Sequence, residues 1–226
     1  MTSAADAKPV AARLLAVVLL ALVLVSAALA ATDPRAEKRR LRRADVALAK
    51  RTNLKLSELG AAWRSFPASA PSGSSSSCPG YRPDFSRFTI TGEAIAAYVS
   101  STGSSIVSSV QVYPSRAQAA ADFRLGARPG FARCLGQMFE TDIARGAGGR
   151  GTTVSSRMLA SPRVGERAAW YRLVGRLTVR GRTIPVYLDV LGVQQGRSQA
   201  GLFFTGLGGP QRGQVALARR LAARMR

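Results

Sequence analysis

The stretch YRLVGRLTVRGRTIPVYLDV, residues 171–190, decides the fold of this 226-residue chain because it predicts a β-hairpin. Arg180 and Gly181 suit a two-residue turn between two runs of alternating apolar residues. With that turn, one side of the hairpin is apolar along both strands, and this side is expected to enter the core. Its facing pairs are Leu177 with Ile184, Gly175 with Val186, Leu173 with Leu188, and Tyr171 with Val190.

The opposite side of the same hairpin is more polar. Its facing pairs are Thr178 with Thr183, Val174 with Tyr187, and Arg172 with Asp189. Opposite charges at facing positions stabilise an antiparallel pair, whereas a slip of one residue would turn both charges toward the core. The sequence therefore predicts that Arg172 and Asp189 form a surface ion pair, and it gives Asp189 no catalytic role.

The segments on either side of the hairpin predict further strands and helices. Ser115 followed by Gln118 has the spacing of a capping box, which indicates the start of a helix. We expect strands over residues 88–101, 105–113 and 200–205, and helices after Ser115, over 131–144 and over 210–226. This order is typical of an α+β fold, a twisted antiparallel β-sheet with helices packed largely on one face, preceded by an N-terminal hydrophobic helix.

That N-terminal helix is predicted from LLAVVLLALVLVSAALAA, residues 14–31, an 18-residue apolar run without a charge. Ala28 and Ala30 satisfy the small-x-small rule, so the run is either a signal peptide cleaved after Ala30 or an uncleaved membrane anchor. The remainder of the chain is then extracytoplasmic, either membrane-anchored or secreted.

A basic segment follows the apolar run. Asp33 as N-cap and Pro34 at the first helical position predict a helix over residues 33–51. Such a helix is either a solvated basic element or one that is attracted to anionic headgroups. Its charge also argues against export, because basic residues beside a span tend to remain cytoplasmic. Within this segment, the basic residues nearest the apolar run are Arg35, Lys38, Arg39, Arg40, Arg42 and Arg43.

The two cysteines favour export. Cys78 and Cys134 both follow the apolar run, and an even cysteine count in an exported chain favours one disulfide over two buried free thiols. The chain has no histidine, so ordinary zinc ligation is not expected, and neither is a Ser-His-Asp triad or a Cys-His pair. We therefore expect no cofactor, no metal site and no enzymatic activity.

The formal net charge of +21 raises the question of a polyanionic partner. The arginines are scattered along the chain, and no recognition helix or aromatic platform accompanies them, so specific nucleic-acid binding is not expected. Anionic lipid or an acidic envelope polymer is the expected polyanion, and the N-terminal helix is expected to contact the membrane. A hydrolase of unfamiliar type would need a pocket around a buried carboxylate such as Glu93 or Asp122.

Three segments carry a resemblance to a known family: LSELGAAW (56–63), CPGYRPDFSRFTITGEA (78–94) and VSSVQVYPSRAQAAADF (107–123), with Cys134 downstream. This pattern resembles exported actinobacterial proteins that are similar to the extracellular sensor domain of PknH-type receptor kinases. The resemblance implies a twisted sheet with helices forming a cleft, and binding of an unidentified extracellular ligand. It transfers no catalytic residues. It also implies two disulfides in those domains, whereas this chain can form one.

These observations predict four parts of the chain. They are a signal peptide or membrane anchor (1–31), a basic juxtamembrane helix with a docking turn (32–64), a Ser/Pro-rich linker (65–80) and a sensor-like α+β domain (81–226). The expected function is a non-enzymatic extracytoplasmic ligand-binding module whose ligand is an unknown small molecule or envelope component. The alternative is an envelope-associated structural protein that binds anionic lipid or polymer through its basic surface.

Overall fold

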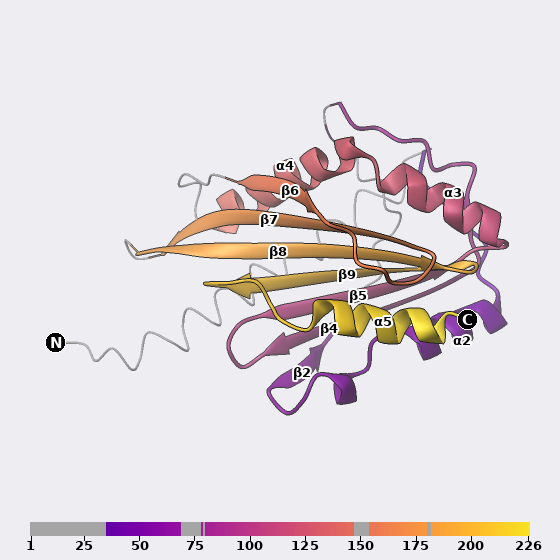
Figure 1. Cartoon of the computed structure of the whole chain (residues 1–226), viewed down its shortest axis with the longest axis horizontal. Helices are drawn as coiled ribbons and strands as arrows, with labels where there is room; N and C mark the ends of the chain where they lie inside the picture. Colours follow the sequence, from indigo (N-terminus) through magenta and orange to yellow (C-terminus); the bar gives the residue numbers. More distant parts are fainter. Residues whose placement is uncertain (1–34, 69–77, 79, 147–153, 180–181) are drawn as a thin grey trace.

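The computed structural model describes residues 35–68, 78, 80–146, 154–179 and 182–226 (Figure 1). A seven-stranded antiparallel sheet with the strand order β2-β4-β5-β9-β8-β7-β6 forms its centre. The strands are β2 (Trp63–Phe66), β4 (Gly92–Ser100), β5 (Ser105–Val112), β6 (Ser155–Leu159), β7 (Arg167–Val179), β8 (Arg182–Gln195) and β9 (Ser198–Leu207). The helices are α2 (Arg43–Thr52), α3 (Arg116–Gly126), α4 (Pro129–Gly146) and α5 (Gln214–Arg224), with a 3-10 turn η2 (Leu56–Glu58).

The β7–β8 hairpin has the register that its sequence predicts. Leu177 lies opposite Ile184, Leu173 opposite Leu188, and the pairing continues to Val179 opposite Arg182. The turn residues 180 and 181 lie outside the described residues. On the predicted core side, five side chains are buried together under α4: Tyr171, Leu173, Leu177, Val186 and Val190.

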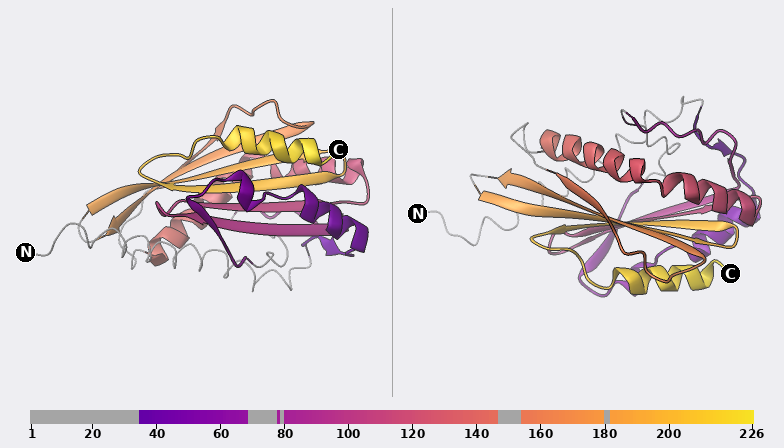
Figure 2. Two further views of the ribbon diagram at one scale, coloured as in Figure 1. Left: turned by 90° about the horizontal axis from the view of Figure 1, so that it is seen from below. Right: turned by 45° about the horizontal axis from the view of Figure 1, so that its top comes forward.

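The fold class is confirmed as α+β with an antiparallel sheet, but the helices are placed differently from the expectation. They cover both faces of the sheet, and Figure 2 (right) shows the sheet between α3–α4 and α5. One apolar cluster joins Leu135 and Phe139 of α4 to β7 and β8. The other joins Ala49 of α2 and Leu221 of α5 to the opposite face. On the polar side of the β7–β8 hairpin, α5 therefore covers the end that holds Asp189, whereas Thr183 near the turn stays exposed.

The start of α3 is capped as predicted, with one difference. The Ser115 hydroxyl accepts a hydrogen bond from the Gln118 backbone N–H at 3.2 Å. The Gln118 side chain does not return to Ser115, as it would in a complete capping box, but accepts from the Thr89 backbone N–H at 3.2 Å. Half of the motif therefore ties α3 to β3 (Thr89–Ile90).

The basic segment predicted as a helix over residues 33–51 is only partly helical. Residues 33 and 34 lie outside the described residues, and the helix α2 begins at Arg43. Ahead of it, β1 (Lys38–Arg39) pairs in parallel with β3, and the backbone N–H of Arg42 donates to the Thr91 carbonyl at 2.7 Å. The β1–β3 pairing takes the place of the first turns of the expected helix. In this arrangement the backbone N–H groups ahead of α2 donate to carbonyl groups of the segment around β3.

The predicted juxtamembrane segment is thus part of the sheet domain. Ala49 and Leu54 belong to the apolar cluster under α2 and α5. Strand β2 pairs with β4 from Trp63 opposite Ser100 to Phe66 opposite Ala97, so it extends into the predicted linker. Of the predicted linker, residues 69–77 and 79 lie outside the described residues.

The described part of the chain contains no helix that is long and apolar enough to cross a membrane. The apolar run at residues 14–31 lies outside it.

Candidate functional site

The basic residues singled out from the sequence lie along the entry to α2. The backbone N–H groups of Lys38 and Arg40 donate to Phe88 and Ile90 carbonyls at 3.0 and 2.9 Å. The Arg39 guanidinium forms an ion pair with Glu93 on β4 at 3.0 Å. The structure therefore brings these residues together at one edge of the domain. All six residues lie at the surface, although the Arg39 side chain is only 28% exposed: Arg35, Lys38, Arg39, Arg40, Arg42 and Arg43.

Helix α2 is held on the sheet by a buried acid and a close backbone contact. The Asp45 carboxylate accepts a hydrogen bond from Arg197, which holds the pKa of Asp45 below its usual range. Gly92 lies against Asp45 so closely that a Cβ atom there would come within 2.2 Å of the Asp45 carbonyl oxygen. Ala49, on the same side of the helix, is fully buried. These contacts turn the opposite side of α2 outward.

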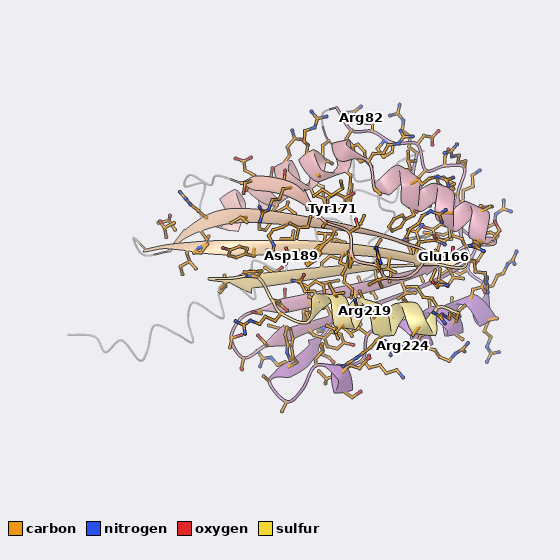
Figure 3. The ribbon with its side chains drawn as sticks, in the orientation of Figure 1. Arg82, Glu166, Tyr171, Asp189, Arg219 and Arg224 are labelled. Carbon is orange, nitrogen blue, oxygen red and sulfur yellow. A yellow bond between two sulfur atoms is a disulfide. The ribbon has the colours of Figure 1, made fainter. Side chains whose placement is uncertain are left out.

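Helix α5 is held in a similar way beside it. Gln214 in its first turn donates to Asp189 at 2.6 Å, and Ala218 and Leu221 are fully buried. Figure 3 shows Arg219 and Arg224 on this helix. Arg219 is exposed, whereas Arg224 forms an ion pair with Glu58 at 3.1 Å. The outward side of α5 is therefore basic.

The two helices contact each other on the same face of the sheet. The Thr52 hydroxyl at the end of α2 donates to the Arg224 carbonyl at 3.3 Å, and the chain ends beside α2 (Figure 1). We call the exposed basic residues of these two helices the basic helical face: Arg43, Lys50, Arg51, Arg219 and Arg220.

The predicted ion pair between Arg172 and Asp189 forms, but the carboxylate is buried. Arg172 Nε and Nη2 donate to the two oxygens of Asp189 at 2.7 and 2.8 Å, and this contact raises the pKa of Arg172. The Asp189 side chain is only 1% exposed because Gln214 of α5 also covers it. The pair is therefore an internal connection between the sheet and α5 and not a surface feature.

Another buried acid, Asp122, lies on α3. Tyr113 and Gln199 donate to the same oxygen of its carboxyl group at 2.9 and 2.8 Å. Burial is the main cause that raises the pKa of Asp122 to about 6; the nearby buried Glu37 contributes to the rise, and the two hydrogen bonds oppose it. Such a shift is common at catalytic acids but also arises in structural networks. One donor, Gln199, lies on β9 and the other, Tyr113, directly follows β5, so the contacts give Asp122 a role in packing α3 against the sheet.

The other carboxylate considered for catalysis, Glu93, is paired with Arg39, as described above. Glu166, which the sequence analysis left without a role, is also engaged. It accepts from the Gly196 backbone N–H at 3.1 Å, which lowers the pKa of Glu166, and from Arg116 Nε at 2.9 Å. These contacts join α3 to the β8–β9 turn, which is a long-range arrangement that sequence spacing does not reveal.

Cys78 and Cys134 form the disulfide that the sequence favours, with Cα atoms 5.4 Å apart. The bond joins the segment before β3 to α4. It lies in a small cluster with Tyr81 and Phe131, whose ring centroids are 5.9 Å apart. Within the described residues no group of three or more histidine, cysteine, aspartate or glutamate side chains is arranged to hold a metal ion.

The fold and the disulfide define an α+β protein with one antiparallel sheet covered by helices on both faces. No family model matches the chain, and no curated protein matches it. Among solved structures, it is similar to the extracellular domain of PknH from Mycobacterium tuberculosis, which is the domain type that the sequence resembles. That similarity has 7% identity, a TM-score of 0.48, and coverage of 80% of this chain and 95% of the other. LpqN, involved in cell envelope biogenesis of Mycobacterium tuberculosis, has 12% identity, a TM-score of 0.28, and coverage of 73% and 75%.

Proposed function

We propose that this chain is a non-enzymatic binding module on the outer side of a bacterial membrane, where it binds an envelope ligand. The observation that carries the proposal is the disulfide between Cys78 and Cys134. Disulfides persist in oxidising compartments and are rare where glutathione or thioredoxin keeps thiols reduced. The uncharged run at residues 14–31 supports the same placement, either as a retained anchor or as a signal peptide.

The absence of histidine from the sequence supports a non-enzymatic role, because histidine supplies the general base in most nucleophilic triads. The buried acids Asp122 and Asp189 are hydrogen-bonded to side chains of the fold itself. Because these contacts hold the fold together, neither acid is assigned to catalysis. Binding is therefore better supported than catalysis as the function of this chain.

A second candidate is attachment to anionic lipid or an acidic envelope polymer through basic side chains. It is favoured by the exposed basic residues between Arg35 and Arg51 and by the net charge of +21. Such a surface attracts anions over a long range with a strong dependence on salt. Measuring binding at low and high ionic strength separates the two candidates. Only binding through the basic surface should be lost at high ionic strength.

The proposed location is tested by the intact mass of the protein recovered from its native host, before and after reduction. We expect no thiol to be alkylated before reduction and two to be alkylated afterwards. The same spectrum shows whether residues 1–30 are retained. Two freely alkylated thiols on a full-length chain would overturn the proposed location, because they indicate a reducing compartment.

A further inference from the structure

The outward surfaces of α2 and α5 have an unusual composition. The exposed positions of the two helices hold only arginine, lysine and alanine: Arg43, Ala44, Lys50 and Arg51 on α2, and Ala216, Arg219, Arg220 and Ala223 on α5. These helices lie next to each other on one face of the sheet. Their exposed side chains therefore form a surface on which every charge is positive.

The acidic residues near this surface are already neutralised. Asp45 is buried against Arg197, and Glu58 is paired with Arg224. On the other face of the sheet the charges are mixed, since α4 exposes both Arg133 and Glu140. The helix dipole favours Lys50 and Arg51 in the last turn of α2, but it disfavours Arg43 in the first turn and so does not explain the positive charge there.

The covalent connection places this surface close to a membrane. Lys38 is the first residue of β1, and it lies seven positions after Ala31 at the end of the apolar run. A fully extended segment of that length reaches at most about 25 Å. If the run is retained, the domain cannot leave the headgroup region by more than this distance. Helix α2 begins a few residues further on, so the basic helical face is near the tether.

We propose that the basic helical face docks on anionic phospholipid headgroups and turns α2 and α5 toward the membrane that holds the N-terminal run. Charge complementarity with phosphate and the short tether favour this partner. The inference rests on the proposed function only in requiring a retained membrane segment. It adds an orientation and assigns α5, at the other end of the sequence, a role in docking.

The test uses the full-length protein in lipid nanodiscs with single fluorescent labels. Because the two native cysteines are joined, a new cysteine provides a unique thiol. Ala223→Cys places a label on the exposed side of α5, and Ala117→Cys places the matched control on the exposed side of α3. Discs contain phosphatidylcholine alone or with phosphatidylglycerol, and a headgroup spin label quenches fluorophores that approach the surface.

We expect quenching at position 223 to exceed that at 117 by about threefold in discs with phosphatidylglycerol, and the difference to vanish in phosphatidylcholine or at high salt. It should also vanish in a variant with Lys50→Gln, Arg51→Gln, Arg219→Gln and Arg220→Gln. A control variant removes four exposed charges elsewhere, through Arg124→Gln, Arg128→Gln, Arg133→Gln and Arg163→Gln, and should retain it. Circular dichroism checks that both variants are folded.

Equal quenching at the two positions, or a difference that survives neutralisation of the face, would overturn the inference. So would an equal loss of the difference in the control variant, because this would show a response to net charge alone. These results are independent of the intact-mass and thiol-alkylation measurements, which test whether the domain is extracytoplasmic. Conversely, reduced cysteines in the native host would overturn the location and leave the disc result to decide the docking surface.

Discussion

Asp122 is 6% exposed as a residue, and its carboxyl group lies near the buried acid Glu37. Its two hydrogen-bond donors, Tyr113 and Gln199, contact one oxygen, while the other oxygen has no partner among the described residues. A carboxylate in such a position costs free energy that the protonated form does not. The stability of the domain is therefore coupled to the protonation of this single residue.

We expect this coupling to appear as a loss of stability with rising pH. The pKa of Asp122 is raised from 3.8 to about 6, so between these values the folded state binds more protons than the unfolded state. The free energy of unfolding then falls as pH rises through this window, by about 2–3 kcal/mol from this residue. Asp122→Asn should remove that slope and increase stability at pH 7.5, as measured by urea denaturation.

The matched control is Glu140→Gln on the exposed side of α4. It should leave the pH dependence between pH 4 and 6 close to that of the unchanged protein, since it removes an exposed side chain and leaves the buried Asp122 in place. An Asp122→Asn variant with an unchanged slope would show that Asp122 is ionised without penalty in the folded protein.

The contacts of a residue can be predicted from the sequence where its partner lies on the neighbouring strand of the same hairpin. Arg172 and Asp189 were expected to meet because they face each other across a hairpin, and they do. Their burial was missed because Gln214, which covers Asp189, comes from a helix 25 residues later in the chain. The contact between Asp45 and Arg197 was not predicted either, and these residues are 152 positions apart.

At the scale of elements, the position of α2 depends on the lack of a side chain at Gly92 in β4. A Cβ atom at this position would lie 2.2 Å from the Asp45 carbonyl oxygen and 2.8 Å from the Asp45 Cβ atom. Gly92→Ala should push α2 away from the sheet and reduce the free energy of unfolding by about 1–3 kcal/mol, the usual range for overpacking. Urea denaturation measures this loss, and limited proteolysis should show earlier cleavage within α2.

Gly126→Ala is the matched control, because nothing lies within 4 Å of a Cβ atom there and the residue ends α3. It should be neutral or stabilising by up to about 1 kcal/mol, since alanine favours helices over glycine. Equal effects of the two substitutions would contradict the close approach of α2 and β4.

Elements with a strong local signal were predicted from the sequence. The register of β7 and β8 was predicted from a two-residue turn and from apolar residues at every second position. The start of α3 was predicted from its N-cap residue, Ser115. The parallel β1–β3 pair was missed, because two-residue strands have no periodicity and their partner is 51 positions away (Lys38 to Thr89). Helices on both faces were also missed, since the charges on the hairpin indicated a solvent-exposed side.

At the scale of the whole molecule, the disulfide closes a loop with a sequence separation of 56 between the segment before β3 and α4. Replacing both cysteines by alanine should reduce the free energy of unfolding by about 4 kcal/mol in the chain-entropy model. Urea denaturation of the variant and of the reduced native protein should give similar losses. A variant as stable as the oxidised protein would show that α4 is held by its apolar contacts alone.

The parallel pairing of β1 with β3 also has a mechanical consequence. Lys38, Arg40 and Arg42 donate backbone hydrogen bonds of 3.0, 2.9 and 2.7 Å to this part of the fold. Any tension that arrives from the N-terminal side must pass through these bonds before it reaches α2 or the seven-stranded sheet. A pull that separates β1 from β3 would therefore lengthen the extended segment ahead of α2 while the seven-stranded sheet stays intact.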